Sequence, residues 1–234
     1  MNERFAFDLD LAGHATVAGA DEAGRGCLAG PLVAAAVSFD YAAMDDADFA
    51  ALDALNDSKK LPKARRAALY DEILRRARQV VIVCRSAGTI DREGLHRCNL
   101  DALARAVEGI APAPRVTLID GFRLPGCRRP HRAVVGGDGR SAAIAAASVV
   151  AKVTRDRLML RLHLSHPQYG FDRHVGYATA AHRGAIAEHG VCALHRLSFA
   201  SVAYRQLGLT FDDGIVNPPV SIRERHPGSR IGTL

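Results

Sequence analysis

The chain has 234 residues, 48% of them hydrophobic and 24% charged, which is an ordinary globular composition with enough apolar material for a sizeable core. The net charge of +6 fits a polyanionic partner without proving one. The sequence shows no apolar stretch long enough to span a bilayer and no leader pattern, and its five cysteines lack metal-ligand spacing. We therefore expect a cytoplasmic, monomeric protein with reduced thiols and no membrane partner.

The predicted elements follow from periodicity and turn residues. In chain order they are strands over 16–21 and 31–39, helices over 41–56 and 63–77, a strand over 80–84, a helix over 97–109, strands over 116–119 and 133–135, and helices over 142–163 and 179–189. The first two strands are expected to be antiparallel, and Ser141 is placed to cap the long helix. This order predicts a mixed sheet flanked by helices. Residues 206–234 are poor in core-forming residues and are predicted to be a loose tail after a domain of residues 1–205.

Acidic residues follow three of the predicted strands. Asp21, followed directly by Glu22, ends the first strand, Asp120 ends the fourth, and Asp138 follows the fifth within a glycine-rich run. Strand ends on one side of a sheet are where sites assemble, and clustered carboxylates repel one another unless cations lie between them. Oxygen-only ligands favour Mg²⁺ or Mn²⁺, and two such ions can serve hydrolysis of a phosphodiester.

A structural interpretation of the same acids stays open at this point. An aspartate at a strand end commonly caps a turn or the next helix. Adjacent residues on a strand also point to opposite faces, so Asp21 and Glu22 are expected to share a site only if the chain bends there. The turn Gly24-Arg25-Gly26 makes such a bend plausible, but periodicity alone does not decide.

Six blocks resemble, in the same order, the signature segments of ribonuclease HII. They read ADEAGRGCLAGPLV at residues 20–33, NDSKKL at 56–61, LIDG at 118–121, IAAASVVAKVTRDRLM at 144–159, YGF at 169–171 together with HVGYAT at 174–179, and HRLSF at 195–199. The resemblance covers about residues 16–204, and six ordered blocks are far more specific than any one of them. Two positions depart from the family: Cys27 stands where proline is usual, and Gly136 where lysine is usual.

The resemblance implies an RNase H-like fold, a mixed five-stranded sheet with flanking helices and a helical C-terminal part. It implies metal binding and catalysis by Asp21, Glu22, Asp120 and Asp138, with two Mg²⁺ or Mn²⁺ ions. It further implies that the backbone of Gly24, Arg25 and Gly26, together with Tyr177, recognises the ribonucleotide 2′-OH. Ser58, Lys59 and Lys152 lie in the matching blocks and are expected to contact the substrate.

The expected function is hydrolysis of the RNA strand of RNA/DNA hybrids and cutting 5′ to ribonucleotides embedded in duplex DNA, as in ribonucleotide excision repair. Cutting would leave 5′-phosphate and 3′-hydroxyl ends. Several basic residues are candidate phosphate contacts, although a solvated surface is the commoner role for any one of them: Lys59, Lys60, Lys152, Arg155, Arg157 and the loop residues Arg123, Arg128, Arg129 and Arg132. The histidines at 163, 166, 174, 182 and 195 are expected to be structural, because they lack metal-site spacing.

Two other functions remain possible on the sequence alone. A nuclease of the same fold that processes DNA junctions would have no need to sense a 2′-OH, so the Gly24-Arg25-Gly26 turn and Tyr177 argue against it. A hybrid-binding module without catalysis is disfavoured by the four carboxylates, which would weaken binding to phosphate unless metal were present.

Overall fold

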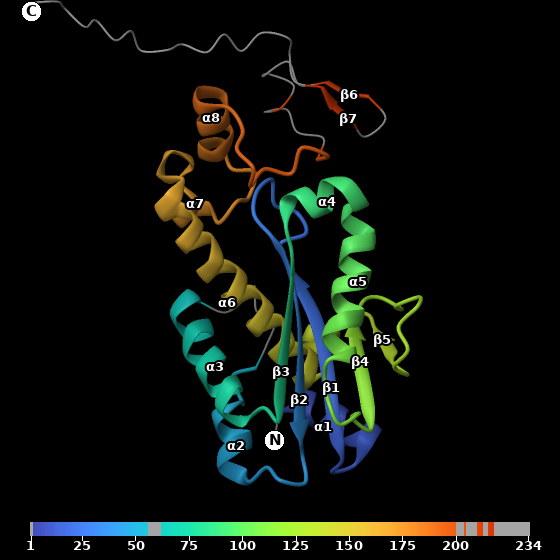
Figure 1. Cartoon of the computed structure of the whole chain (residues 1–234). Helices are drawn as coiled ribbons and strands as arrows, with labels where there is room; N and C mark the ends of the chain where they lie inside the picture. Colours follow the sequence, from blue (N-terminus) through green and yellow to red (C-terminus); the bar gives the residue numbers. More distant parts are fainter. Residues whose placement is uncertain (1, 56–61, 200–203, 205–209, 213–214, 218–234) are drawn as a thin grey trace, which may run out of the picture.

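A computed structural model describes residues 2–55, 62–199, 204, 210–212 and 215–217. Its centre is a five-stranded sheet with the order β3-β2-β1-β4-β5 (Figure 1). The strands are β1 (Thr16–Ala23), β2 (Leu32–Asp40), β3 (Gln79–Arg85), β4 (Val116–Asp120) and β5 (Arg132–Val134). β1 is antiparallel to β2 and parallel to β4, so the mixed sheet and the antiparallel first pair are confirmed.

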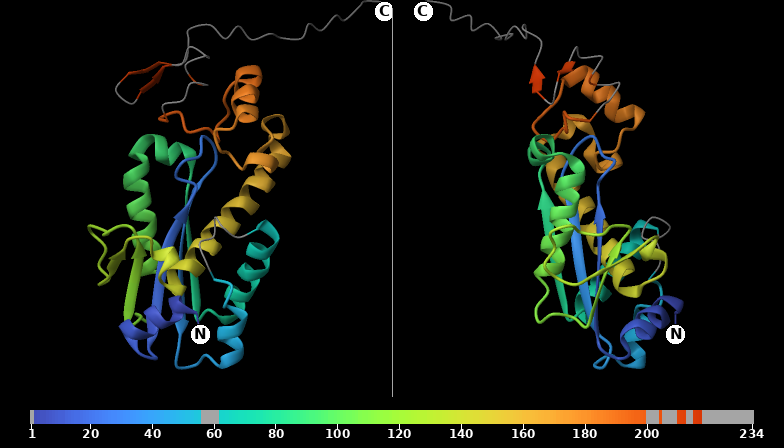
Figure 2. Two further views of the ribbon diagram at one scale, coloured as in Figure 1. Left: turned by 180° about the vertical axis from the view of Figure 1, so that it is seen from behind. Right: turned by 90° about the vertical axis from the view of Figure 1, so that its right-hand side faces the viewer.

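Helices cover both faces of the sheet (Figure 2). The long α6 (Ala142–Ser165) packs on one face together with α1 (Glu3–Ala12) and α3 (Lys63–Arg76), and α5 (Leu95–Glu108) packs on the other. Successive side chains of β2 point to opposite faces of the sheet and pack into two hydrophobic cores. Val33 and Val37 pack on the α6 side, and Ala34 and Ala36 pack on the α5 side. Because both faces are covered, β2 is apolar along nearly its whole length.

The helix α6 approaches β1 closely at Gly19. A Cβ atom at this position would lie 2.2 Å from the backbone carbon of Ala143, so only glycine permits the crossing. On the helix side five alanines, at positions 142, 143, 145, 146 and 147, keep the surface flat, and all five are fully buried. Ser141 caps the helix by accepting a hydrogen bond from the Ile144 N–H at 3.2 Å, as predicted. This contact fixes how far along β1 the later turns of α6 lie.

Three parts of the chain differ from the predicted elements. The helix expected over 41–56 is wrong except for α2 (Asp46–Ala51), because Asp45 and Asp48 form a capping box that starts the helix late. The N-terminal helix α1 was not predicted, although Asn2 caps it. A separate helix α4 (Ala87–Glu93) precedes α5, and Gly94, with φ of 82°, divides the two.

Beyond the sheet, α6 continues into a small helical region. It contains α7 (Phe171–His174) and α8 (Ala180–His189), which lie at the same end of the molecule as the C-terminal part of α6 (Figures 1 and 2). The last described segments are β6 (Thr210–Asp212) and β7 (Ile215–Asn217), which pair with each other. The rest of the predicted tail, 206–234, lies outside the described residues. None of the described helices has the length and apolar character needed to cross a membrane.

Candidate active site

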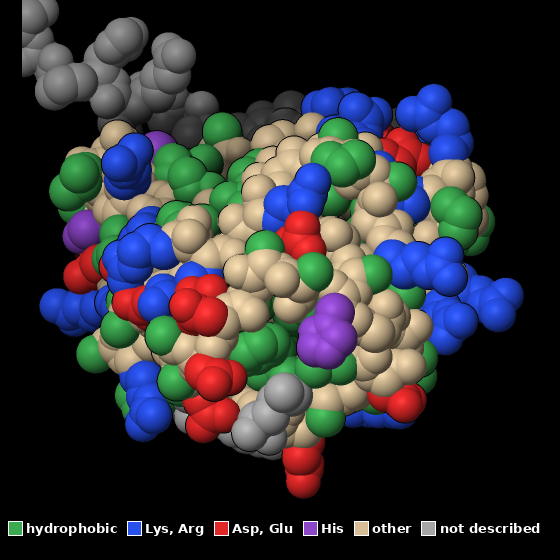
Figure 3. Space-filling view, turned by 90° about the horizontal axis from the view of Figure 1, so that it is seen from below, with side chains coloured by type: hydrophobic (Ala, Val, Ile, Leu, Met, Phe, Trp, Pro, Cys, Tyr) green, Lys and Arg blue, Asp and Glu red, His purple; other side chains and the backbone are tan. Residues whose placement is uncertain are grey.

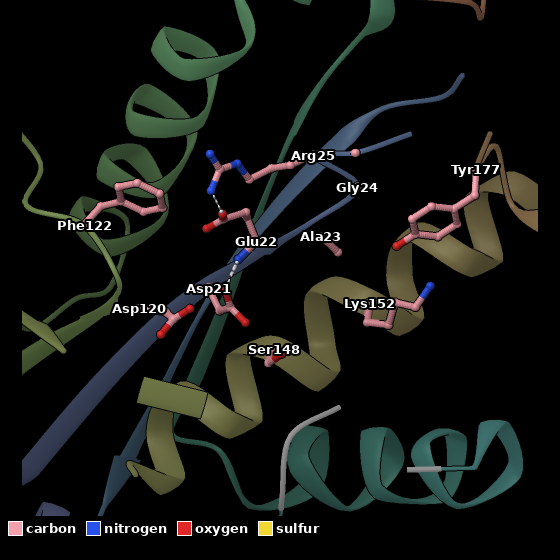
Figure 4. A pocket seen from close by; sticks show the side chains of 11 residues that line it. Asp21, Glu22, Ala23, Gly24, Arg25, Asp120, Phe122, Ser148, Lys152 and Tyr177 are labelled. Carbon is pink, nitrogen blue, oxygen red and sulfur yellow. Dashed lines mark hydrogen bonds and ion pairs between the residues drawn. The ribbon is translucent and has the colours of Figure 1, made fainter. Parts of the chain in front are cut away.

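Two of the predicted aspartates meet because β1 and β4 are parallel neighbours. Ala20 is paired with Ile119, so Asp21 and Asp120 follow at the same level at the carboxyl ends of their paired segments. Both side chains line one pocket of about 280 Å³ (Figure 4). Asp120 also accepts a hydrogen bond from the Gly137 N–H at 2.7 Å, which ties the turn after β5 to this carboxylate.

Glu22 reaches the same pocket by a route that the sequence did not predict. β1 keeps its regular register with β2 through Ala23, so the pairing shows no irregularity between Asp21 and Glu22. Pairing with β4, however, stops at Ala20, which leaves the edge of β1 open from Asp21 onward. Asp21 and Glu22 then leave the strand on different sides and flank this open edge (Figure 4). The expected bend is therefore unnecessary, since the pocket surrounds the edge of the strand.

The surroundings of Asp21 and Glu22 disfavour the ionised form of both carboxyl groups. Burial raises the pKa of Asp21 to about 8, and the charges of Glu22 and, less strongly, Asp120 contribute to the rise. Burial also raises the pKa of Glu22, against the opposing effect of Arg25, whose Nη1 lies 3.2 Å from Glu22 Oε1. The second oxygen of Glu22 is buried without a hydrogen-bond partner. The site holds more negative charge than its own residues neutralise.

The glycine-rich loop forms one wall of the pocket. Gly24, Arg25 and Gly26 all line it, and Gly24 has φ of +94°, a conformation that favours glycine. A Cβ atom at Gly26 would meet nothing within 4 Å, so the backbone there is open to an approaching ligand. The guanidinium of Arg25 lies 4.9 Å from the centre of the Phe122 ring while it holds Glu22.

Tyr177 and Lys152 lie at the far side of the pocket from Asp120 (Figure 4). Tyr177 is 42% exposed, so it is available to a ligand and is no core aromatic. Lys152 Nζ lies 5.4 Å from the centre of the Tyr177 ring and 2.7 Å from Asp156 Oδ1. An isolated antiparallel β-bridge between the backbones of Cys27 and Tyr177 joins this side to the glycine-rich loop. Burial raises the pKa of the Cys27 thiol, which disfavours the reactive thiolate.

Asp138 is near the site but does not line the pocket. It lies in the turn of residues 137–139, next to Gly137, whose N–H is bound by Asp120. The carbonyl oxygen of Asp138 accepts a hydrogen bond from Arg4 at 3.3 Å. Gly136 has φ of 61°, so this turn favours glycine over a residue with a side chain. The guanidinium carbon of Arg140 lies 5.0 Å from the centre of the Phe7 ring.

Three pocket neighbours were not identified from the sequence. Ser148 and Phe122 line the pocket, and the Ser148 hydroxyl bonds Asp21 and favours its charged form. Asn99 on α5 is fully buried beside Glu22 and favours the charged form of that carboxylate. The only available signal was the spacing of Ser148 and Lys152, which stand four apart and so share a helix face.

Other predicted residues have different positions. The prediction that Arg155 contacts phosphate is wrong, because the side chain is fully buried and its N–H groups donate to backbone carbonyl oxygens. In the basic loop, Arg129 binds the carbonyl oxygens of Glu108 and Ile110, and Arg128 pairs with Glu108. His174, His182 and His195 are buried. Ser58, Lys59 and Lys60 lie outside the described residues.

The donor set of the pocket fits a hard divalent cation. Asp21, Glu22 and Asp120 supply only oxygen atoms, and one of these, Glu22 Oε2, is buried without a partner. Among the residues that the structure describes, no group of three or more His, Cys, Asp or Glu side chains is already arranged to hold a metal ion. Mutual repulsion gives a reason for this looser arrangement, since like charges approach closely only with a cation between them.

Comparisons with known proteins agree on one family. The family model described as Ribonuclease HII matches residues 18–202. A ribonuclease HII of Rhizobium johnstonii is 48% identical over 212 residues, covering 88% of this chain and 89% of the relative, and one of Azorhizobium caulinodans is 50% identical over 197 residues, covering 84% and 73%.

Solved structures show the same fold. The ribonuclease H2 of Pyrococcus horikoshii superposes with a TM-score of 0.68 at 22% identity, covering 82% of this chain and 96% of that one. The RNase HII of Archaeoglobus fulgidus, solved in complex with PCNA, superposes with a TM-score of 0.66 at 25% identity, covering 80% and 96%. Bst-RNase HIII, solved in complex with Mn²⁺, superposes with a TM-score of 0.65 at 22% identity, covering 84% and 70%.

Proposed function

The chain belongs to the ribonuclease HII family, and from this premise we propose that it hydrolyses the RNA strand of RNA/DNA hybrids and also cuts 5′ to single ribonucleotides embedded in duplex DNA. Family membership makes it a ribonuclease H, a metal-dependent endonuclease. The finer activity is supported by one observation above all. Three carboxylates and the open backbone of the Gly24-Arg25-Gly26 loop line the same pocket, so groups suited to metal binding and groups suited to contact with a sugar lie in one site.

In this proposal Asp21, Glu22 and Asp120 hold divalent metal, and Asp138 supplies a fourth carboxylate from the adjoining turn. Two bound Mg²⁺ or Mn²⁺ ions would supply Lewis acidity at the attacking water and at the departing 3′-oxygen. The Mn²⁺ in the structure of Bst-RNase HIII supports the choice of metal. Asp21 and Asp120, at one level on paired strands, would hold the metal from one side of the strand edge, and Glu22 would hold it from the other. The products are 5′-phosphate and 3′-hydroxyl ends.

The loop and Tyr177 recognise the ribose. Selecting RNA over DNA at one position requires contact with the 2′-OH, and glycine lets backbone N–H and C=O groups come close enough. The hydroxyl of Tyr177 can donate or accept a hydrogen bond while its exposed ring stacks on a sugar or base. Lys152, which lies over the Tyr177 ring, and Arg25 supply positive charge for phosphate in this proposal. Ser58 and Lys59 remain proposed substrate contacts outside the described residues.

The Tyr177→Phe substitution tests the ribose reader. Loss of the hydroxyl should lower the cutting rate at a single embedded ribonucleotide by about tenfold, the equivalent of about 1.4 kcal/mol, while hybrid affinity stays within about twofold. Cutting would be followed under single-turnover conditions, and affinity would be measured with chelator present. Equal losses in rate and affinity would contradict a role in recognition.

The decisive experiment uses a labelled duplex with one ribonucleotide. We expect cutting 5′ to that ribonucleotide with Mg²⁺ or Mn²⁺ and none with chelator, and no cutting of the all-DNA duplex. A DNA-junction nuclease would instead cut branched DNA and ignore the ribonucleotide. Monomeric state, cytoplasmic location and a part in ribonucleotide excision repair stay predictions of the sequence.

A further inference from the structure

Two arginines outside the pocket are buried to an unusual degree. Arg155 on α6 and Arg196 in the segment after α8 are both 0% exposed, although arginine is rarely fully buried unless it is paired. Within the described part of the chain neither one forms a salt bridge with a carboxylate. Each must therefore be stabilised in another way, and the partners of its donors show how.

Nearly all of those partners belong to one loop. Arg155 donates to the carbonyl oxygens of Ala29 and Pro31 at 3.0 Å each, and to that of Val175 at 2.8 Å. Arg196 donates twice to Gly30, at 3.0 and 2.9 Å, and its Nη1 donates to Gly24 at 2.7 Å and to Arg25 at 3.1 Å. The two guanidinium groups thus donate hydrogen bonds to carbonyl oxygens at both ends of the loop of residues 24–31.

The loop is shaped to lie directly on these side chains. A Cβ atom at Gly24 would fall 2.1 Å from Arg155 Nε, and one at Gly30 would fall 2.2 Å from Met159 Sδ. Both glycines have positive φ, +94° and +89°. On the opposite side, by contrast, a Cβ atom at Gly26 would meet nothing within 4 Å. The loop therefore has one side held by buried arginine and one side open to the pocket.

Arg155 also connects the loop to Tyr177. Its third carbonyl partner, Val175, lies two residues before the tyrosine, and its guanidinium carbon lies 6.0 Å from the centre of the Tyr177 ring. The arrangement is costly, since burial and, less strongly, repulsion from Arg155 lower the pKa of Arg196 to about 10. An apolar pair of similar volume would avoid that cost but would leave six backbone carbonyl oxygens without these donors.

We propose that Arg155 and Arg196 are positioning residues that preorganise the Gly24-Arg25-Gly26 backbone and Tyr177 as a single reader of the ribose, without touching the substrate themselves. The inference rests on the proposed function, because it explains how the reader of that same site is held. Misplacement of a positioning element by about 1 Å is enough to cost about 100-fold in rate. The arginines are therefore expected to act on the rate of cutting more than on binding of the duplex.

The test compares Arg155→Lys, Arg155→Met, Arg196→Lys and Arg196→Met with the wild type. Single-turnover cutting would be measured on a duplex with one ribonucleotide, and dissociation constants on the same duplex with chelator. We expect rates to fall about 10- to 100-fold in the methionine variants and less in the lysine variants, which keep one charged donor, while dissociation constants change by less than about threefold. Arg161→Met, an exposed position on the same helix, is the matched control and should keep the wild-type rate.

Folding is checked by circular dichroism and by hydrogen exchange. The proposal predicts faster exchange confined to residues 24–31 and 175–177, with the sheet unchanged. If a methionine variant does not fold, the lysine variant decides. Folded variants with wild-type rates, or dissociation constants that rise in step with the loss of rate, would overturn the proposal. If the wild type itself ignored the single ribonucleotide, the proposed function would fail instead, and the arginine variants would be compared on an RNA/DNA hybrid.

Discussion

At the scale of single residues, the pocket carboxylates differ in their surroundings. Asp21 is 7% exposed and meets the hydroxyl of Ser148, whereas Glu22 pairs with Arg25 and has the buried Asn99 beside it. Burial outweighs these hydrogen bonds, so ionised Asp21 is a source of instability in the protein without metal. The carboxylate that we propose as a metal ligand is thus one whose charge the fold disfavours when no cation is bound.

Replacing Asp21 by asparagine should therefore abolish cutting and stabilise the metal-free protein. The folded pKa of Asp21, about 8, lies above the unfolded value of 3.8, so the folded state binds more protons between these pH values and loses stability as pH rises through them. Asparagine never ionises, so its advantage should grow from nothing near pH 4 to roughly 1–3 kcal/mol near pH 8. Urea unfolding of both proteins with chelator present, at several pH values, measures this difference in stability. A variant less stable than the wild type at pH 8 would contradict the assignment.

At the scale of elements, the crossing of α6 over β1 sets the geometry of the site. Gly19 and Ala143 are in contact at the crossing, and Ser148 and Lys152 follow on the same helix. α6 therefore delivers one residue to Asp21 and another to Tyr177 from a single rigid body. Sites built on regular elements are held more firmly than sites on loops. The glycine-rich loop is the exception in this pocket.

Gly19→Ala tests the importance of the crossing. The added methyl group would lie 2.2 Å from helix backbone, which cannot move aside like a flexible side chain, so we expect a loss of about 2–3 kcal/mol in the free energy of unfolding and a lower cutting rate. Gly184→Ala in α8, where a Cβ atom meets nothing within 4 Å, is the control and should be neutral or slightly stabilising. Equal stability of the two variants, measured by urea unfolding, would rule out this tight contact.

The helical region after α6 is predicted to be sensitive to acid. His182 donates from Nδ1 to the Tyr177 carbonyl oxygen at 2.9 Å, which leaves its Nε2 to accept from His195 Nε2 at 3.2 Å, and His174 stacks on the His182 ring at 4.4 Å. Burial lowers the pKa of both His182 and His195 to about 4. Protonation of His182 would set two N–H donors against each other.

The unfolded histidines bind protons near pH 6.5 and the folded ones only near pH 4, so the stability that the neutral pair contributes is complete above pH 6.5 and is lost as pH falls. We expect a loss of roughly 2–4 kcal/mol between about pH 7 and pH 5. His182→Gln combined with His195→Gln should flatten this dependence, and the exposed His14→Gln should leave it unchanged. A double variant with the wild-type pH profile in urea unfolding would show that other groups are responsible.

At the scale of the whole molecule, the net charge is +6, but some of the basic side chains already bind partners within the chain. Acidic and basic side chains are interspersed at the end that carries α1 and α2 (Figure 3). In the loop of residues 123–132, Arg129 holds two carbonyl oxygens of its own scaffold and Arg128 pairs with Glu108. Only part of the positive charge is therefore free to neutralise phosphate, and a moderate salt dependence follows.

Affinity for an RNA/DNA hybrid, measured by fluorescence anisotropy with chelator, should fall about 10- to 100-fold between about 50 and 200 mM salt. Lys152→Ala should reduce the slope of log affinity against log salt by about one. An affinity that did not change with salt would mean that the positive surplus has no part in binding.

The sequence by itself determined the elements with strong local signals and the residues that end them. The strands, the long capped helix and the aspartates at the ends of β1 and β4 all follow from periodicity, capping and turn chemistry, which act over a few residues. The six ordered blocks identified the family for the same reason, since they are local strings. Where the local signal was mixed, as in the alanine- and aspartate-rich stretch of residues 41–56, the prediction was wrong over most of its length.

Only the tertiary structure decided how these pieces combine. That Glu22 reaches the pocket depends on β4 ending at the level of Asp21, and that Asn99 and Ser148 border it depends on which helix packs on which face. Arg155 shows the difference most sharply. Its place in a basic motif suggested phosphate, but the close approach of α6 to the sheet buried it beneath the glycine-rich loop. Local sequence encodes backbone conformation, whereas contacts between distant segments are set by packing, which no short pattern contains.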